Sequence, residues 1–176
     1  VAYSLLGNIR EDITTVALGT SKDGKPVYLR DICGREEGAP PPVDLVEERE
    51  NGDVVRALIQ DRSATAVHDV SDGGLLVAIT EMAMASGIGA KLDAAPEDVE
   101  AHAFWFGEDQ ARYVMTVKAA DADRIMRNIQ GASIPVSRLG TTGGDTVAIA
   151  NERPVTVAAL NSAFEGWLPA YMAGKN

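Results

Sequence analysis

Six residues near the middle of the chain, Asp69-Val70-Ser71-Asp72-Gly73-Gly74, combine two carboxylates, a hydroxyl and two glycines. Glycine has no side chain to shield its amide, so a phosphate can approach the backbone closely there. Ser71 can donate its hydroxyl to the same anion. The two aspartates would repel a phosphate unless a Mg²⁺ ion lay between carboxylate and phosphate. These residue types therefore suit a phosphate accompanied by a divalent cation.

The surrounding sequence places this motif at a strand-to-helix turn. Residues 65–70 are predicted to form a strand, and apolar residues at helical spacing predict a helix from Leu75 to about Gly87. The first N–H groups of a helix lack intrahelical acceptors and attract anions. Serine and aspartate are also preferred helix caps, and glycines permit tight turns. The motif by itself therefore supports two interpretations, a binding site and a helix cap.

A second polar segment follows roughly 35 residues later. Phe106-Gly107-Glu108-Asp109-Gln110-Ala111-Arg112 places two carboxylates, an amide and a guanidinium between predicted strands at 103–106 and 112–117. Such carboxylates could hold a cation or accept ligand hydroxyls, and Gln110 could both donate and accept. The alternative is an acidic turn in which Arg112 pairs with a neighbouring carboxylate. Neither polar segment decides the function alone.

The composition restricts the partners. Asp and Glu number 26 against 16 Lys and Arg in 176 residues, a net charge of −10. Duplex-binding domains normally carry the opposite sign, so we expect no nucleic-acid partner. We also expect no membrane partner, since no apolar stretch reaches the ~20 residues that span a bilayer. The lone cysteine, Cys33, excludes an internal disulfide and fits a reducing cytoplasm.

Strands and helices alternate along the chain without a strict strand-helix-strand rhythm. The further predicted elements are strands at 13–19, 27–29 and 88–92, helices at 44–60, 119–130 and 155–172, and a hairpin of 135–139 with 146–149 around Gly143-Gly144-Asp145. This order favours an α+β fold, a layered α/β sandwich with a mixed β-sheet, over a Rossmann sheet. The first residue is Val1 rather than methionine, which suggests a fragment of a longer protein.

Taken together, these segments resemble one family. "VHDVSDGG" before a helix, followed by "GEDQARYVMTV", is similar to the C-terminal domain of the aminoimidazole ribonucleotide synthetase superfamily. Within it, the chain most resembles the synthetase (large) subunits of phosphoribosylformylglycinamidine synthases. "GREEGAPPPVDL" resembles the connector before that domain, and "EGWLPAYMAG" the extreme C-terminus of bacterial members. The resemblance implies three parts: the end strand of a preceding barrel-forming domain (1–20), a connector (21–42) and the C-terminal synthetase-like domain (43–176).

The resemblance also implies an activity. In this family ATP activates the formamide oxygen of formylglycinamide ribonucleotide, and ammonia displaces phosphate to give the amidine during purine synthesis. The implied cofactors are ATP or ADP and Mg²⁺. The implied partners are the other domains of the same synthetase, a glutaminase subunit that supplies ammonia, and a small accessory subunit. Because the active site is built from several domains, we expect the isolated chain to be inactive.

By the same resemblance, the first motif supplies the nucleotide contacts. Asp69 falls at a Mg²⁺-ligand position and Ser71 at a nucleotide-phosphate contact, with Asp72, Gly73 and Gly74 in the same turn. Glu108, Asp109 and Gln110 align with a segment that, in the other half of the family enzyme, contacts the ribonucleotide. No residue of this chain is assigned a catalytic role.

Several alternatives stay open. The second-half site of long-chain members is an auxiliary site, so these residues could hold a structural ADP–Mg²⁺ instead of a reactant. A purely structural domain, whose motif only caps a helix, is a further alternative. The runner-up is a related synthetase of the selenophosphate synthetase or thiamine-monophosphate kinase type. One segment departs from the family pattern, the turn "GTSKDGKPVYL", where family members usually have a longer segment that contains Leu-Gly-Gly-Ser.

Overall fold

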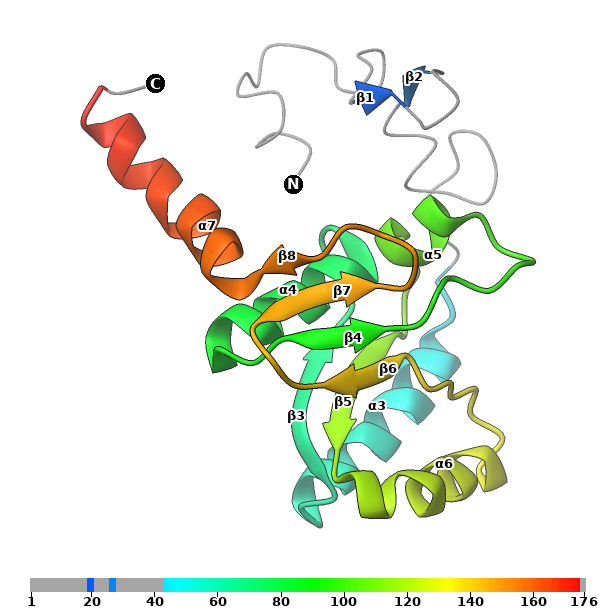
Figure 1. Cartoon of the computed structure of the whole chain (residues 1–176). Helices are drawn as coiled ribbons and strands as arrows, with labels where there is room; N and C mark the ends of the chain where they lie inside the picture. Colours follow the sequence, from blue (N-terminus) through cyan, green and yellow to red (C-terminus); the bar gives the residue numbers. More distant parts are fainter. Residues whose placement is uncertain (1–18, 21–25, 28–42, 175–176) are drawn as a thin grey trace. The chain divides into compact units, whose positions relative to one another are not determined.

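The computed structural model describes residues 19–20, 26–27 and 43–174 (Figure 1). Contacts divide the chain into two compact units. The first contains the described residues up to Ala57, with Asp69–Ala78 and Ala95–Val114, and the second contains Leu58–His68, Ile79–Ala94 and the described residues from Met115. Both polar segments singled out in the sequence therefore belong to the first unit.

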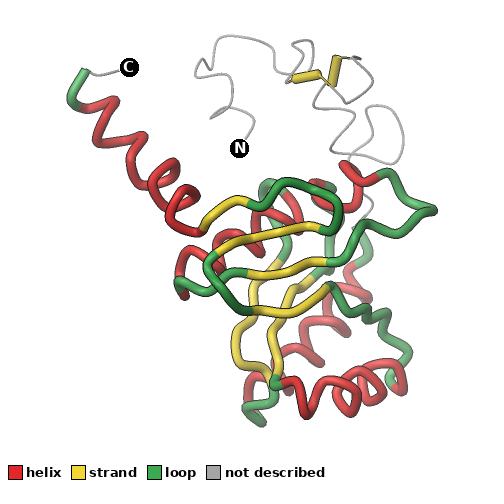
Figure 2. The backbone as a smooth tube through the Cα atoms, viewed as in Figure 1, coloured by secondary structure: helices red, strands yellow, loops and turns green. Residues whose placement is uncertain are grey.

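Helices, strands and loops are coloured separately in Figure 2. The helices are α3 (Leu45–Gln60), α4 (Gly74–Ser86), α5 (Ala101–Phe106), α6 (Ala122–Gly131), preceded by the 3-10 turn η1 (Ala119–Asp121), and α7 (Val157–Met172). The strands are β1 (Gly19–Thr20), β2 (Pro26–Val27), β3 (Ala64–Asp69), β4 (Ala90–Leu92), β5 (Tyr113–Val117), β6 (Gly140–Thr142), β7 (Thr146–Ile149) and β8 (Val155–Thr156). Within the described ranges, no helix combines the length and apolar character needed to traverse a bilayer.

Strands β1 and β2 pair antiparallel. Most of the strand predicted at 13–19 and of the connector, including Cys33, falls outside the described residues. The predicted division of the chain at residues 20 and 42 therefore stays a prediction.

The second unit contains a four-stranded mixed sheet in the order β6-β4-β7-β8 (Figure 1). Strands β4 and β7 run parallel, whereas β4 with β6 and β7 with β8 run antiparallel. Ala90 of β4 faces Val147 of β7 on one side and Thr142 of β6 on the other. The α+β class with a mixed sheet is confirmed.

The predicted hairpin around Gly143-Gly144 is wrong, because β6 and β7 both pair with β4, which lies between them. The glycine turn binds the residue that precedes β4. Gly143 N–H donates to the Gly89 carbonyl at 2.8 Å, and Gly89 N–H donates to the Gly144 carbonyl at 2.9 Å. At Gly140 a Cβ would overlap the Lys91 carbonyl, so glycine permits this close approach of β6 to β4. The glycines in a sequence predict a turn, but they do not predict whether the strands before and after it pair with each other.

Residues 103–106, predicted as a strand, belong to helix α5. A run of four apolar residues fits either period, and tertiary packing decides between them. Phe104 N–H donates to the Glu100 carbonyl at 3.0 Å, a helical bond. The indole of Trp105 is almost fully buried, and the Phe104 ring meets it edge-on at 4.9 Å between centroids. Burial of Trp105 thus accompanies a short helix here.

The strands predicted at 65–70 and 112–117 are confirmed as β3 and β5, which pair with each other. The hydroxyls of Thr65 and Thr116 lie 2.7 Å apart, and Val70 N–H donates to the Arg112 carbonyl at 2.8 Å. Residue numbers rise along one strand as they fall along the other, so the two strands run antiparallel. The turn after β3 and the loop before β5 consequently meet at the same end of this pair.

Helix α4, also confirmed, contributes buried side chains to both units: Leu75 and Ala78 to the first, Ile79 and Ala83 to the second. The other buried apolar residues are Val55, Val70, Trp105 and Val114 in the first unit, and Ala90, Leu92, Ile125, Ile129, Val147 and Val157 in the second.

The last helix starts later than predicted. Val155 and Thr156 form β8 and pair with β7 before α7 begins. The Thr156 hydroxyl then accepts a hydrogen bond from Ala159 N–H at 3.1 Å and caps the helix. Pairing with the sheet therefore takes two residues that the apolar pattern had assigned to the helix.

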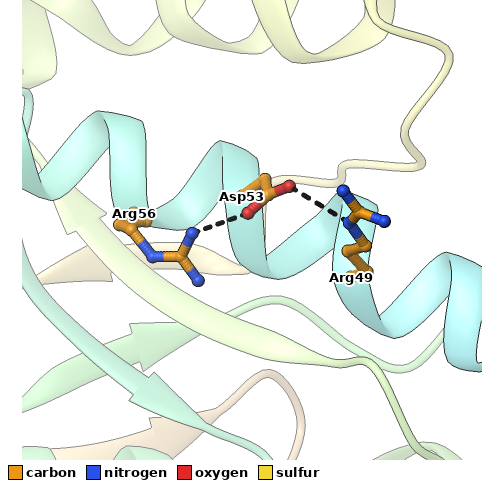
Figure 3. Close-up of polar contacts among 3 residues, drawn as sticks. All are labelled: Arg49, Asp53 and Arg56. Carbon is orange, nitrogen blue, oxygen red and sulfur yellow. Dashed lines mark hydrogen bonds and ion pairs between the residues drawn. The ribbon is translucent and has the colours of Figure 1, made fainter.

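The helix predicted at 44–60 is confirmed as α3, which runs unbroken through Asn51-Gly52. Its exposed face carries Asp53 between two arginines (Figure 3), with Asp53 Oδ1 2.7 Å from Arg56 Nη1 and Oδ2 3.9 Å from Arg49 Nε. Exposed pairs of this kind contribute only about 0.3–0.5 kcal/mol each. Gly52 lies beside Tyr113, since a Cβ there would be 3.4 Å from the Tyr113 hydroxyl oxygen, close to ordinary van der Waals contact.

Candidate functional site

The turn that joins β3 to α4 contains the first polar motif. Val70 is buried, whereas Asp69, Ser71 and Asp72 are exposed. Gly74 N–H donates to the Ser71 carbonyl at 3.0 Å, which closes the turn. Gly73 and Gly74 have φ angles of 84° and 76°, in the left-handed region where glycine is strongly preferred. The backbone therefore presents the side chains of Ser71 and Asp72 to solvent at the tip of the turn.

The two polar segments meet at a single hydrogen bond. Gly73 N–H donates to Glu108 Oε1 at 2.8 Å, although the residues are 35 positions apart. Gly73 is buried and Glu108 is half-buried. A carboxylate is a strong acceptor for a backbone amide, and negative charge is favoured at a helix N-terminus. The Gly73 amide, which the sequence indicates as a phosphate contact, is therefore bonded in this structure to the carboxylate of Glu108.

Gly74 lies directly against the end of helix α5. A Cβ on Gly74 would be 2.6 Å from the carbonyl carbon of Phe106 and 2.7 Å from its Cα. Real Cβ atoms do not approach backbone this closely, so only glycine fits. This packing gives the second glycine of the motif a structural reason that is independent of any ligand.

The loop from Gly107 to Arg112 is held at several points. Arg112 Nη1 lies 3.7 Å from Asp109 Oδ2 and 3.4 Å from the Gly107 carbonyl oxygen. Ala111 has a φ of 63°, and its carbonyl accepts a hydrogen bond from Asn51 Nδ2 at 2.9 Å. The predicted alternative of an acidic turn paired with Arg112 is thus present in the structure. Asn51 was not predicted, because nothing in its local sequence links α3 to a loop 60 residues away.

Asp109 is half-buried, and Gln110 at the tip of the same loop is exposed. The structure therefore brings all the predicted residues into one unit: the turn at 69–74 and the loop at 108–110. Glu108 and Gly73 are in direct contact. The exposed members are Asp69, Ser71, Asp72 and Gln110.

These residues could hold a metal ion only if a bound phosphate or water supplied the remaining metal ligands. In the described part of the chain, no cluster of three or more His, Cys, Asp or Glu side chains could hold a metal ion. Mg²⁺ is commonly bound by one or two carboxylates, with substrate phosphates and water completing its six ligands. Asp69 is an exposed carboxylate at the end of β3, so it could be one of the carboxylates in such an arrangement. Asp69 alone would therefore supply only one of the ligands that such a cation needs.

Tyr113, the first residue of β5, belongs to the same neighbourhood and was not predicted as a site residue. Burial raises the pKa of its phenol above the ordinary value, and the carboxylates of Glu48 and Asp69 raise this pKa further. Arg56 acts in the opposite direction on the same pKa. A phenol near Asp69 adds a neutral hydrogen-bonding group beside these carboxylates.

A Tyr113→Phe variant should lose the phenol with this raised pKa. A phenol whose pKa is raised by folding contributes stability that is fully present below its unfolded pKa, about 10. That contribution is lost as the pH rises through the folded pKa. Absorbance titration should show a late-ionising tyrosine in the wild type that is absent from Tyr113→Phe and retained in Tyr171→Phe, an exposed control. Loss of the late phase in Tyr171→Phe would contradict the assignment to Tyr113.

Comparison with known proteins places this geometry in a family. A family model described as AIR synthase related protein, C-terminal domain, matches residues 16–150 and so includes both polar segments. The chain belongs to this family. Its fold is accordingly that of an AIR synthase related C-terminal domain.

Curated relatives of this family member are synthase subunits. The chain is 62% identical over 152 residues to phosphoribosylformylglycinamidine synthase subunit PurL of Bradyrhizobium diazoefficiens, covering 86% of this chain and 21% of that protein. It is 61% identical over 153 residues to the subunit of the same name in Rhodopseudomonas palustris, covering 87% and 21%. The chain thus spans about a fifth of the length of these relatives.

Solved structures share the fold. T. maritima PurL complexed with FGAR superposes with a TM-score of 0.61 at 17% identity, over 72% of this chain and 23% of that chain. PurLQS from Thermotoga maritima gives a TM-score of 0.61 at 16% identity, over 68% and 22%. T. maritima PurL complexed with ATP gives 0.56 at 17% identity, over 64% and 21%. This level of identity supports the fold of the AIR synthase related domain.

Proposed function

We propose that this chain is the C-terminal domain of an ATP-dependent ligase that converts formylglycinamide ribonucleotide to formylglycinamidine ribonucleotide in purine synthesis. The observation that carries the proposal is the 62% identity over 152 residues to a curated PurL subunit. The T. maritima relatives complexed with FGAR and with ATP agree with it at the level of fold. The same identity favours this function over a selenophosphate synthetase or a thiamine-monophosphate kinase.

In this proposal the exposed tip of the β3–α4 turn faces the nucleotide. Ser71 donates its hydroxyl to a phosphate oxygen, and Asp69 is the carboxylate that holds Mg²⁺. When bound, the cation would neutralise phosphate charge and relieve the repulsion from Asp69 and Asp72. Gly73 and Gly74 shape the turn, which is supported by their positive φ angles and by the contact of Gly74 with Phe106.

The loop before β5 would supply the second set of ligand contacts. Gln110 is exposed and can both donate to and accept from ribose or amide groups. Asp109 is the neighbouring carboxylate, with Arg112 at 3.7 Å to limit its motion. We assign these two residues to the substrate or to an auxiliary nucleotide. The family resemblance gives Glu108 the same assignment, and its contact with Gly73 leads to a different proposal below.

The partners follow from the same assignment. The active site would be completed by the other domains of the synthetase, because this chain corresponds to about a fifth of its relatives. A glutaminase subunit and a small accessory subunit are proposed as further partners, in line with the PurLQS assembly of T. maritima. We place the reaction in the cytoplasm.

A domain exchange tests the proposal. The matching segment of B. diazoefficiens PurL would be replaced by this chain, and ATP-dependent amidine formation measured with ammonia as the nitrogen donor. We expect turnover within about tenfold of the parent enzyme, because neighbouring domains would meet a surface that is 62% identical over the matched 152 residues. The isolated chain should give no turnover above a control without protein.

The two arms of the experiment report on different claims. A folded but inactive chimera, beside an active parent, would contradict the assignment of this chain to the ligase. Turnover by the isolated chain would contradict the claim that the active site is composite.

A further inference from the structure

The turn that carries Ser71 and Asp72 is tied on both sides to one loop. Before the two residues, Val70 N–H donates to the Arg112 carbonyl at 2.8 Å. After them, Gly73 N–H donates to Glu108 Oε1 at 2.8 Å. The first bond continues the pairing of β3 with β5, so it depends on backbone alone. The second depends on one side chain.

The backbone amides that a ligand phosphate could use in this turn already have acceptors within the chain, and Glu108 is the acceptor for Gly73. The Gly74 amide is already bonded to the Ser71 carbonyl, and the space beside the Gly74 Cα is filled by the Phe106 backbone. Gly73 is buried, and its hydrogen bond to the half-buried Glu108 carboxylate is itself partly buried. A phosphate could reach the exposed Ser71 hydroxyl without displacing Glu108.

The loop that carries Glu108 is itself braced. Asn51 of α3 donates to the Ala111 carbonyl at 2.9 Å, and Arg112 contacts both Asp109 and the Gly107 carbonyl. Because the backbone of this loop is already held, little further backbone freedom is lost when its carboxylate accepts a hydrogen bond from the turn.

We propose that Glu108 is a positioning residue whose carboxylate holds the Gly73 amide and thereby fixes the turn that presents Asp69 and Ser71. The identity of the ligand at that turn rests on the proposed function, but the holding contact does not. Glu108 would act through the backbone of the turn and would not touch the nucleotide or the substrate.

Amide hydrogen exchange on the full chain tests the contact directly. Glu108→Ala removes the acceptor, so exchange of the Gly73 amide should accelerate about tenfold or more. Glu108→Gln keeps a side-chain oxygen in the same place, so exchange should stay within about threefold of wild type. Glu97→Ala, which removes an exposed carboxylate from the same unit, should leave Gly73 unchanged. Circular dichroism would establish that each variant is folded.

Kinetic measurements on the exchanged-domain enzyme, in which this chain replaces the matching segment of B. diazoefficiens PurL, distinguish a positioning role of Glu108 from direct contact with the ligand. Glu108→Ala should raise the KM for ATP by about tenfold, and Glu108→Gln should restore most of that loss. A carboxylate that touched the ligand through its charge would make Glu108→Gln as damaging as Glu108→Ala. A simple loss of folded protein would lower kcat and leave KM unchanged.

Two results would overturn the proposal: unchanged Gly73 exchange in folded Glu108→Ala, or equally fast exchange in Glu108→Gln and Glu108→Ala. If Glu108→Ala does not fold, Glu108→Gln decides alone, since wild-type exchange supports the proposal and accelerated exchange contradicts it. Because exchange is measured without any ligand, failure of the proposed ligase activity would leave this pattern intact.

Discussion

A Gly74→Ala substitution should lower the free energy of unfolding by about 3 kcal/mol or more, the sum of two penalties. Alanine at a φ of 76° is strained by about 1–2 kcal/mol. Its Cβ would also lie 2.6 Å from the Phe106 carbonyl carbon, so α5 or the turn must move. Urea unfolding followed by fluorescence measures the change, since Trp105 is buried beside Phe106.

The other end of the same helix offers a matched control. Gly87 has a φ of 70°, nearly that of Gly74, but a Cβ there would meet nothing within 4 Å. Gly87→Ala should therefore cost only the backbone strain, about 1–2 kcal/mol. The difference between the two variants isolates the contact between Gly74 and Phe106. Equal losses of stability would show that this contact is not close in solution.

Asp69→Asn in the exchanged-domain enzyme should lower ATP-dependent turnover by about 100-fold or more. The substitution keeps the size of the side chain but removes the charge that a cation at the end of β3 would need. The fold should survive, because Asp69 is exposed and the turn is held by the Val70 and Gly73 amides. Turnover and the thermal unfolding midpoint would be measured on the same preparation.

Asp98→Asn is the control, since Asp98 is an exposed aspartate of the same unit outside both polar segments. It should change neither turnover nor stability. The two variants also separate a reactant from a resident nucleotide at this site. If Asp69→Asn lowered the unfolding midpoint and yield while the remaining folded enzyme kept its turnover, the ligand would be a structural nucleotide and the reactant assignment would be wrong.

Elements with a strong local signal were predictable. The short run at 65–70, a glycine turn and apolar residues at helical spacing predict β3, the turn and α4 with small errors at their ends. Two other predictions failed where the local signal was short or ambiguous. The apolar residues 103–106 fit both periods, and the glycines at 143–144 mark a turn without naming the strands beside it.

The candidate site divides in the same way. The sequence was enough to identify the turn and the later loop as possible ligand-binding segments, because carboxylates, hydroxyls and glycines gathered in one short segment are typical of turns and of binding sites. The Gly73–Glu108 hydrogen bond and the hydrogen bond from Asn51 to Ala111 could not be predicted from the sequence. They join residues 35 and 60 positions apart, and no local preference encodes such a partner.

The sequence by itself determined the α+β class, the acidic surface, and the strand, turn and helix that carry Asp69 to Gly74. Only the tertiary structure decided that Gly73 donates to Glu108, that Gly74 packs on Phe106, and that β4 lies between β6 and β7. The physical reason is the range of the interactions. Backbone propensity and hydrophobic period act over a few residues, whereas a buried amide accepts whichever partner the packing of distant elements places beside it.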